Sequence, residues 1–181
     1  MPGRSMGIIP LSEELGFSRA REKVREVFFL TSASGESLGG PKAEDLFFNW
    51  AGWYMENIPE QTLLLREPGN KVIGYLVGCF DSMSAQGLFK HIFYYTTFAC
   101  WYTEYPAHFH VNCHPDYQGV GYGKALVERF ESDAKAAGVR GLHVVTGSKA
   151  RNRTFYERLQ FHERDRRIIG ERSLVLLGKS L

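Results

Sequence analysis

The chain has 181 residues, of which 44% are hydrophobic and 14% aromatic, which is enough for the core of one globular domain. Its 22 basic and 20 acidic residues leave a net charge of +2 with no long run of either sign, so nothing in the composition points to nucleic acid or a membrane surface as a partner. We therefore expect a single domain over residues 1–181 that carries out small-molecule chemistry.

The cysteines and the N-terminal residues indicate in which cellular compartment the protein is expected. Cys79, Cys100 and Cys113 are an odd number scattered through apolar segments, which argues against a disulfide framework and for a reducing compartment. We expect all three to be small core residues. Residues 1–11 contain one arginine and no extended apolar run, which argues against a secretory signal. These features predict a cytoplasmic protein.

The N-terminal part predicts one strand and two helices. A short strand is expected at residues 8–11, and apolar side chains near one face predict a helix over residues 18–30. Residues 32–41 are rich in Ser and Gly and predict a loop. A second helix is expected over residues 43–56, where large apolar residues recur at helical spacing.

A β-hairpin is predicted next. Residues 61–67 and 72–80 resemble strands, and the intervening residues 68–71, Pro-Gly-Asn-Lys, have the composition of a tight turn. We expect these two strands to form a central antiparallel pair.

Residues 88–102 form the longest apolar and aromatic stretch of the chain. It is interrupted by Lys90 and His91 and is shorter than the roughly 20 residues that span a bilayer, so no membrane helix is expected. We predict a buried helix here. The alternative is that these aromatic side chains wall a substrate pocket or form the contact of a homodimer.

The C-terminal half predicts alternating strands and helices. A strand is expected at residues 107–113, and from residue 124 onward one apolar helical face runs to a stop at Gly138. A strand at residues 142–146, a short helix over residues 155–161 and a last strand at residues 173–177 follow.

Residues 118–124, Gln-Gly-Val-Gly-Tyr-Gly-Lys, predict a phosphate-binding turn between a strand and a helix. Three glycines let the backbone turn sharply, and the amides at the start of a helix attract an anion. A dinucleotide-binding fingerprint would need glycine in place of Lys124, and a Walker loop would need glycine in place of Gln118 and Ser or Thr in place of Ala125. Neither of these templates fits.

The pattern that fits is Q/R-x-x-G-x-G/A, formed by Gln118, Gly121 and Gly123, and it resembles the acyl-CoA pyrophosphate loop of the GNAT acyltransferase superfamily. A second stretch, residues 155–161, resembles the F-Y-x-x-x-G-F signature of the same superfamily, and the likeness extends over residues 112–161. Residues 74–78, Gly-Tyr-Leu-Val-Gly, and residues 105–111, Tyr-Pro-Ala-His-Phe-His-Val, resemble bacterial acetyltransferases akin to the acetyltransferase-like domain of O-GlcNAcases. The resemblance implies an α+β GNAT fold, with a mixed, mostly antiparallel central sheet flanked by helices on both faces.

Two positions depart from the superfamily pattern. Gln160 stands where the superfamily usually has glycine. The asparagine expected six residues before the Phe-Tyr pair is replaced by Lys149, and Asn152 comes later.

The resemblance implies acetyl-CoA as the co-substrate and no metal. The amides of residues 119–124 would bind the pyrophosphate, and the backbone of residues 111–113 would pair with the pantetheine as an added strand. The implied cofactor-binding residues are Val111, Asn112, Cys113, Gln118, Gly119, Val120, Gly121, Tyr122, Gly123, Lys124, Asn152 and Phe155.

Acyl transfer needs an acid for the departing thiolate and a neutral amine. Tyr156 matches the superfamily's tyrosine and is the expected general acid, with a buried, locally bonded tyrosine as the alternative. The acidic residue that some members carry early in the strand is Ala107 here. His108 and His110 are the candidate bases. Asp81 or Glu104 acting through water, or a water chain alone, remain open.

A metal site is a further hypothesis besides acyl transfer. His108, His110, Cys113 and His114 are of ligand type, but successive same-face positions on a strand lie roughly 6.6 Å apart, which makes convergence on one ion difficult. Packed or solvated histidines fit better.

The leading hypothesis is an enzyme, an N-acetyltransferase that moves an acetyl group from acetyl-CoA to a primary amine of a small molecule or protein by direct attack in a ternary complex. The alternative is a catalytically silent acyl-CoA-binding module. Neither hypothesis involves nucleic acid or a membrane, and the acceptor is not encoded in the cofactor loop.

Overall fold

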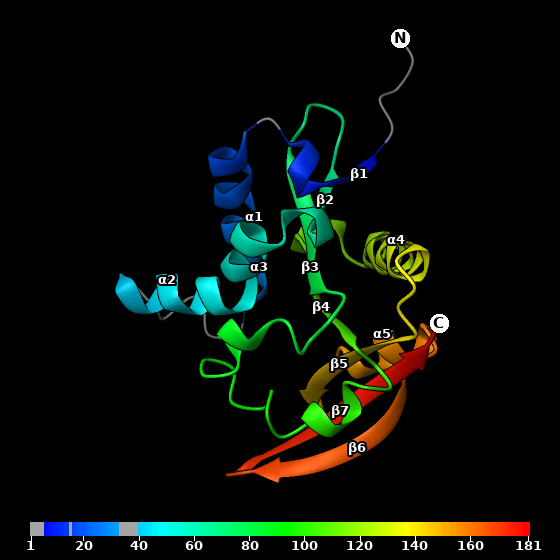
Figure 1. Ribbon diagram of the computed structural model, residues 1–181. Helices are drawn as coiled ribbons and strands as arrows, with labels where there is room; N and C mark the ends of the chain where they lie inside the picture. The colour runs from blue at the N-terminus through cyan, green and yellow to red at the C-terminus, as the bar shows by residue number, and fades with distance from the viewer. Residues whose placement is uncertain (1–5, 15, 33–39) are drawn as a thin grey trace. The chain divides into compact units, whose positions relative to one another are not determined.

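The computed structural model describes residues 6–14, 16–32 and 40–181 (Figure 1). They form two compact units, unit 1 from the described residues up to residue 78 together with residues 110–130, and unit 2 from residues 79–109 and 131–181. Most of the loop predicted at residues 32–41 lies outside the described residues.

The strands of unit 1 begin with an antiparallel group. Strand β1 (Gly7–Pro10) pairs with β2 (Leu63–Arg66), and β2 pairs with β3 (Val72–Cys79). The turn between β2 and β3 places Gly69 at φ 110° and Asn70 at φ 68°, two residue types that tolerate the left-handed region. The predicted first strand and hairpin are therefore confirmed.

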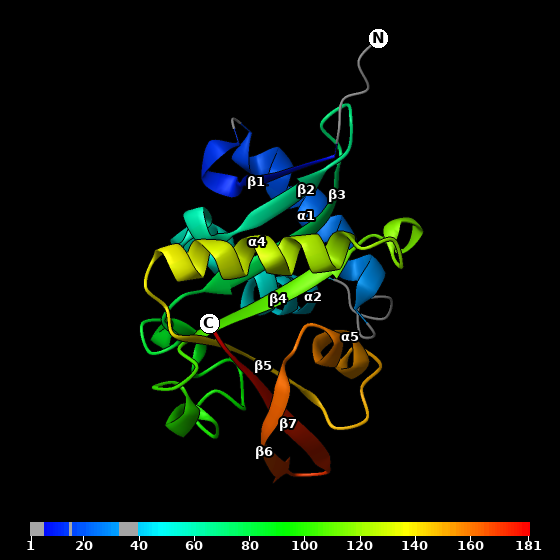
Figure 2. The same cartoon turned by 90° about the vertical axis from the view of Figure 1, so that its right-hand side faces the viewer.

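The helices of unit 1 lie on both faces of these strands. Helices α1 (Phe17–Thr31) and α3 (Trp53–Asn57) lie on one face (Figure 1). The first part of α4 (Tyr122–Ala136) crosses the other (Figure 2). The short helix α2 (Pro41–Phe47) precedes α3. The predicted helices are confirmed, and the buried side chains of α1 include Val24 and Phe28.

One feature of this helical segment was not expected. Between α2 and α3, residues Phe48–Gly52 form a π-helical turn, η3, so the chain stays helical from Pro41 to Asn57 with one wider turn in the middle. Short 3₁₀ turns, η1 (Leu11–Glu13) and η4 (Pro59–Gln61), complete this part of the chain.

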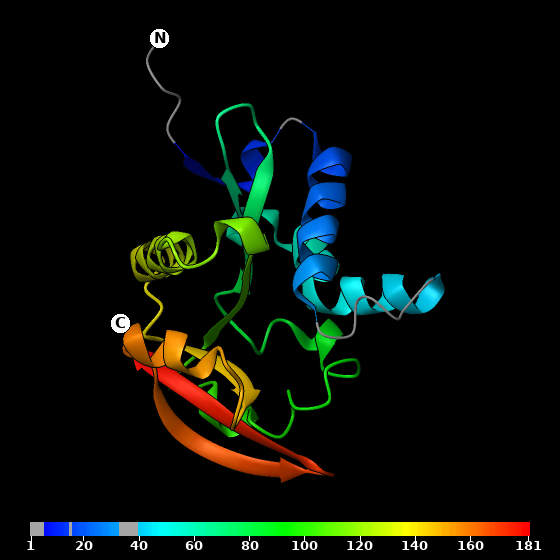
Figure 3. The same cartoon turned by 180° about the vertical axis from the view of Figure 1, so that it is seen from behind.

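Unit 2 contains the first residues of β4 (Ala107–Cys113) and three further strands. Strand β5 (Gly141–Gly147) runs parallel to β4 and antiparallel to β7 (Arg172–Ser180), and β7 pairs with β6 (His162–Ile169). The short helix α5 (Arg153–Arg158) lies against these strands (Figure 3). The predicted strands at β4, β5 and β7 are confirmed, whereas β6 was missed.

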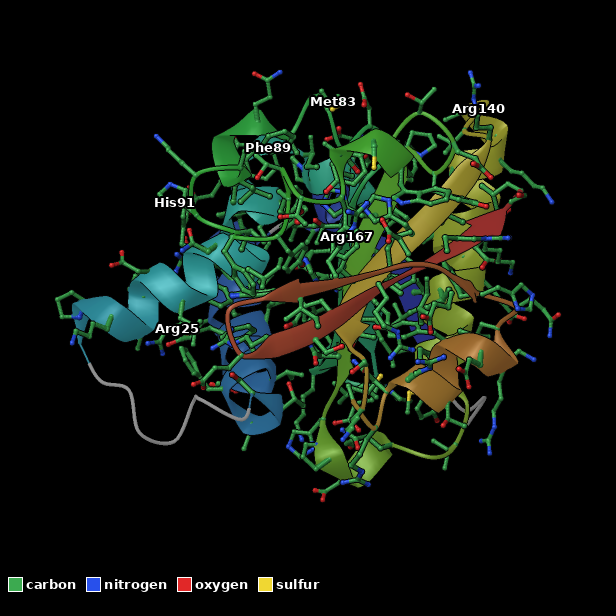
Figure 4. The ribbon with its side chains drawn as sticks, turned by 90° about the horizontal axis from the view of Figure 1, so that it is seen from below. Arg25, Met83, Phe89, His91, Arg140 and Arg167 are labelled. Atoms are coloured by element: carbon green, nitrogen blue, oxygen red, sulfur yellow. The ribbon has the colours of Figure 1, made fainter. Side chains whose placement is uncertain are left out.

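The aromatic stretch of residues 88–102 is not a buried helix, and that prediction was wrong. It belongs to a segment of turns, residues 82–105, that contains the 3₁₀ turns η5 (Gln86–Leu88) and η6 (Ala99–Trp101). Aromatic and β-branched residues have modest helix propensity, and here the side chains of Tyr95 and Trp101 bond to His108 and Asp165, which come later in unit 2. In Figure 4 Met83, Phe89 and His91 lie along this segment.

Tyr105 fixes the end of this segment to the sheet of unit 2. A Cβ added at Gly178 of β7 would lie 2.8 Å from the Tyr105 ring, and one at Gly141 of β5 would lie 2.9 Å from it. The ring therefore packs directly on two glycines in neighbouring strands. The guanidinium carbon of Arg164 lies 5.4 Å from the centre of the same ring.

The strands are ordered β1-β2-β3-β4-β5-β7-β6 in a seven-stranded mixed sheet, and the expected α+β fold class is confirmed. Among the described residues, no helix is long and apolar enough to cross a membrane. Cys79 and Cys113 are buried as expected, but Cys100 is exposed, so the prediction that all three cysteines are core residues was wrong. None of the three forms a disulfide within the described part of the chain.

Candidate functional site

The glycine-rich turn of unit 1 lies between β4 and α4. After the 3₁₀ turn η7 (Pro115–Tyr117), Gly119 has φ 79° and Gly121 has φ 96°, both in the left-handed region. A Cβ at either position would meet nothing within 4 Å, so glycine is needed here for its backbone conformation and not for lack of space.

Helix α4 begins directly after this turn, at Tyr122, and the amide of Ala125 donates to the Gly121 carbonyl at 3.0 Å. The amides of the first helical turn have no carbonyl of their own helix to bond, and the helix dipole adds partial positive charge there. Gly119, Val120 and Gly121 are exposed. The turn is therefore a suitable receptor for an anionic group such as a diphosphate.

Gln118 connects the turn to β4. Its side-chain amide nitrogen donates to the carbonyl of Cys113 at 2.9 Å, and its backbone amide donates to the Pro115 carbonyl at 3.2 Å. Farther along η7, the Tyr117 hydroxyl donates to Glu67 at 2.7 Å. These bonds hold the first residue of the predicted phosphate loop against the end of the strand that precedes it.

The last residues of β4 pack closely against β3. The side-chain nitrogen of Asn112 donates to the Tyr75 hydroxyl at 2.8 Å. A Cβ at Gly74 would lie 3.1 Å from the Cys113 sulfur, so the two strands approach closely there. Burial raises the pKa of the Cys113 thiol to about 11, which keeps it protonated and excludes it as a nucleophile near neutral pH.

His110 projects toward the helices of unit 1. Its imidazole makes edge-to-face contacts with the rings of Trp50, at 5.0 Å between centroids, and Tyr54, at 5.8 Å. Tyr54 is fully buried, whereas Trp50 and His110 are half-buried. This histidine therefore lies at the edge of an aromatic cluster, where the residue is partly exposed but its Nε2 atom is buried.

His108 occupies a different environment, the interior of unit 2, where it is 4% exposed. Its Nδ1 lies 2.7 Å from Ser82 Oγ and its Nε2 lies 2.6 Å from the Tyr95 hydroxyl. Because Ser82 Oγ donates its proton to the Pro106 carbonyl, it accepts from Nδ1–H. Both ring nitrogens of His108 are thus engaged, one with Ser82 and one with Tyr95, which favours a structural role over the predicted role as base.

Tyr156 lies in α5 of unit 2 and is 6% exposed. Its ring contacts those of Phe109, Phe155 and Phe161 in edge-to-face geometry. Burial raises the pKa of the Tyr156 phenol to about 12, so the phenol keeps its proton throughout the physiological pH range. That is the protonation state a general acid requires.

The residues that precede Tyr156 form the start of α5. Asn152 is exposed, its side-chain oxygen accepts a hydrogen bond from Thr146 Oγ1 at 2.8 Å, and its carbonyl accepts from the Tyr156 amide. Phe155 is half-buried. Asn152 therefore ties α5 to the end of β5.

The predicted site residues are divided between the two units. Unit 1 contains His110, residues 111–113 and residues 118–124, and unit 2 contains His108, Asn152, Phe155 and Tyr156. Sequence reasoning missed Ser82, Tyr95 and Trp50 as partners of the two histidines. For Trp50 a signal existed, since the expected helix carried it one turn before Tyr54.

The histidines and the cysteine of β4 do not assemble as ligands. In the described ranges, no group of three or more His, Cys, Asp and Glu side chains is placed to hold a metal ion. His108 bonds Ser82 and Tyr95, whereas His110 contacts Trp50 and Tyr54. The metal-site hypothesis therefore has no geometric support.

Comparison with protein families gives one match. The model of the family described as acetyltransferase (GNAT) domain matches residues 59–163, which include β4, the glycine-rich turn and α5. No curated protein matches the sequence.

Solved structures share the fold. The crystal structure of SsHAT is similar with a TM-score of 0.77 and 23% identity over 98% of each chain. PH1933 from Pyrococcus horikoshii OT3 gives a TM-score of 0.70 and 16% identity over 98% of this chain and 99% of the other. The structure of yncA from Salmonella typhimurium, solved with its cofactor acetyl-CoA, gives a TM-score of 0.61 and 17% identity over 98% of this chain and 95% of the other.

Proposed function

We propose, from the premise that this chain belongs to the GNAT acetyltransferase family, that it transfers an acetyl group from acetyl-CoA to a primary amine by direct attack in a ternary complex. We further propose that residues 1–181 constitute one such acyltransferase domain. The observation that carries the proposal is the glycine-rich turn, because its two positive-φ glycines are exposed and lead directly into the start of α4.

The turn would bind the diphosphate of the cofactor. The amides of residues 119–124 supply hydrogen-bond donors, and the dipole of α4 adds favourable partial charge for an anion. Gln118 would act by holding the turn to the carbonyl of Cys113. Asn152 and Phe155, near Tyr156 in α5, are the proposed additional contacts of the cofactor.

The backbone of β4 would orient the thioester. In unit 2, β4 pairs with β5 at Ala107 and His108, and β4 continues from there to Cys113. We assign the backbone of residues 111–113 to the pantetheine, which would add to it in the manner of a strand. A backbone amide near Val111 would donate to the carbonyl oxygen as negative charge builds on it.

Tyr156 is the proposed general acid. The amine nitrogen attacks the thioester carbonyl carbon, the C–S bond breaks, and the phenol protonates the departing thiolate of CoA. Burial holds the pKa of Tyr156 at about 12, so the proton is present when it is needed. The same apolar surroundings destabilise a thiolate next to the phenol and so raise its proton affinity.

His110 is the proposed base. It is half-buried and lies on β4 next to the proposed pantetheine-binding residues, whereas both nitrogens of His108 are engaged in hydrogen bonds. A neutral imidazole can take the proton that the attacking amine releases. His108 would instead position β4 within unit 2.

The binding step is tested by isothermal titration calorimetry of acetyl-CoA with a matched pair of variants. Gly121→Ala forces a Cβ onto a residue with φ 96° in the proposed loop, and Gly69→Ala does so at φ 110° in the β2–β3 turn, with nothing within 4 Å of either Cβ. We expect Kd to rise roughly tenfold or more in Gly121→Ala and to stay unchanged in Gly69→Ala. Equal effects of the two substitutions, or no binding to the unmodified protein, would remove the proposal.

A further inference from the structure

The π-helical turn Phe48–Gly52 marks the part of unit 1 that faces His110. Turns of this kind are uncommon and occur often at functional sites, because one extra residue in the turn redirects a side chain. Here the turn contains Trp50, and the indole contacts the imidazole of His110 at 5.0 Å between ring centroids.

Three aromatic rings meet at this point. Trp50 and Tyr54 lie four residues apart on one helical face, and His110 of β4 makes edge-to-face contacts with both. Tyr54 is fully buried and forms the base of the cluster, while Trp50 and His110 are half-buried. Trp50 and His110 are therefore the members of the cluster that stay partly exposed, although the Nε2 atom of His110 is buried.

We propose that Trp50 selects the acceptor, and that the acceptor is a primary amine which arrives as a cationic alkylammonium and is held on the indole beside His110. This inference rests on the proposed function, because it assigns the amine of that reaction to this cluster. Trp50 is a specificity-determining residue in this account and takes no part in proton transfer.

The chemistry of the cluster suits an ammonium ion that must later lose a proton. An indole face attracts a cation more strongly than other aromatic rings do. A carboxylate would bind the ammonium more tightly but would also favour its charged form and oppose deprotonation. Strand β4 (Ala-His-Phe-His-Val-Asn-Cys) carries no acidic residue, and its half-buried imidazole can accept the proton instead.

The first test measures binding separately from turnover. The probes are n-butylammonium and the neutral n-butanol, titrated into ¹⁵N-labelled protein saturated with CoA while the indole N–H signal of Trp50, assigned from Trp50→Leu, is followed. We expect the ammonium to shift this signal with a Kd roughly tenfold below that of the alcohol. Equal dissociation constants, or a Trp50 signal that neither probe moves, would overturn the inference.

The second test uses turnover of n-butylamine with acetyl-CoA, followed by thiol release. Trp50→Leu should raise KM for the amine roughly tenfold and Trp50→Phe by a smaller factor, with kcat largely retained in both. The matched control is Trp53→Leu, because Trp53 is also half-buried in this helical segment and its ring contacts Tyr54. A KM unchanged in Trp50→Leu, or raised equally in Trp53→Leu, would contradict the inference.

The two tests separate this inference from the proposed function. If the ammonium binds selectively at Trp50 but no thiol is released, the subsite stands and the enzymatic function fails. If thiol is released with an unchanged KM in Trp50→Leu, the function stands and the role of Trp50 fails.

Discussion

The backbone amide of Phe161 donates to the carbonyl of Tyr156 at 3.1 Å, and this bond closes α5 through a residue in the left-handed conformation, Gln160, at φ 67°. A second bond, from the Gln160 amide to the Glu157 carbonyl at 3.0 Å, completes the helix-ending motif that normally has glycine at this position. The structure thus explains why the superfamily signature has glycine where this chain has Gln160.

The first prediction concerns that residue. Gln160→Gly should stabilise the protein by about 1 kcal/mol, because it removes the steric cost of a side chain in the left-handed region. Urea unfolding measures the gain. Gln160→Ala is the control, since it shortens an exposed side chain but retains the Cβ, and it should give no gain. Equal stability of the glycine and alanine variants would show that the backbone is not strained here.

The second prediction concerns Tyr156. Tyr156→Phe should lower kcat by roughly 10²-fold or more while Kd for acetyl-CoA stays within about twofold, because only the proton donor is lost. Since burial holds its pKa at about 12, the alkaline limb of the wild-type kcat profile should lie above the usual tyrosine pKa of about 10. The control is Tyr102→Phe, which removes another buried hydroxyl in unit 2, bonded to the Tyr95 carbonyl. An unchanged kcat in Tyr156→Phe would remove it from the acid role.

The third prediction concerns the packing of Tyr105 on β7. Gly178→Ala should destabilise the protein by about 1–3 kcal/mol, because the new Cβ would lie 2.8 Å from the Tyr105 ring. Gly7→Ala in β1 is the strand control, with nothing within 4 Å of the added Cβ. Thermal and urea unfolding measure both variants. If Gly178→Ala is tolerated as well as Gly7→Ala, the contact does not limit this part of the fold.

The fourth prediction concerns pH and His143, which is 2% exposed, stacks on the Tyr102 ring and lies 2.6 Å through Nδ1 from the Tyr105 carbonyl. Burial lowers the pKa of His143 to about 4. Between about pH 6.5 and 4 the unfolded chain therefore binds a proton that the folded chain does not, and stability falls as pH falls through this window. The loss should approach about 3 kcal/mol for this group.

Urea unfolding at several pH values checks this prediction. His143→Asn keeps a hydrogen-bond donor near the Tyr105 carbonyl but cannot titrate, so its stability should be lower near neutral pH and should depend less on pH below about 6.5. Identical slopes for the wild type and the variant would show that His143 is not the group responsible.

How much of the fold the sequence predicts depends on how each element is stabilised. Apolar periodicity predicts helix α1, which buries one face, and strand β4, whose first three residues are buried on both faces. Strand β6 was missed because its residues, His-Glu-Arg-Asp-Arg-Arg-Ile-Ile, are mostly exposed and show no alternation. It is held by its backbone pairing with β7 and by the hydrogen bond that the Trp101 indole donates to Asp165, neither of which any periodicity reveals.

The candidate site likewise contains a part that the sequence predicts and a part that it does not. The turn at Gly119 and Gly121 could be predicted, because closely spaced glycines in a sequence indicate a backbone that needs positive φ, and both residues have it. The partners of His108 were not, because Ser82 lies 26 residues away in sequence and Tyr95 lies 13 away. Which of two histidines on one strand is fully buried and which is partly exposed depends on such distant contacts.

The most direct test of the central claim is thiol release from acetyl-CoA in the presence of a panel of primary amines, with the products identified by mass spectrometry. The account predicts one free CoA thiol for each N-acetylated amine, and a rate that falls sharply in Tyr156→Phe. Saturable binding of acetyl-CoA with no thiol release on any amine would contradict it and identify the chain as a catalytically silent acyl-CoA-binding module.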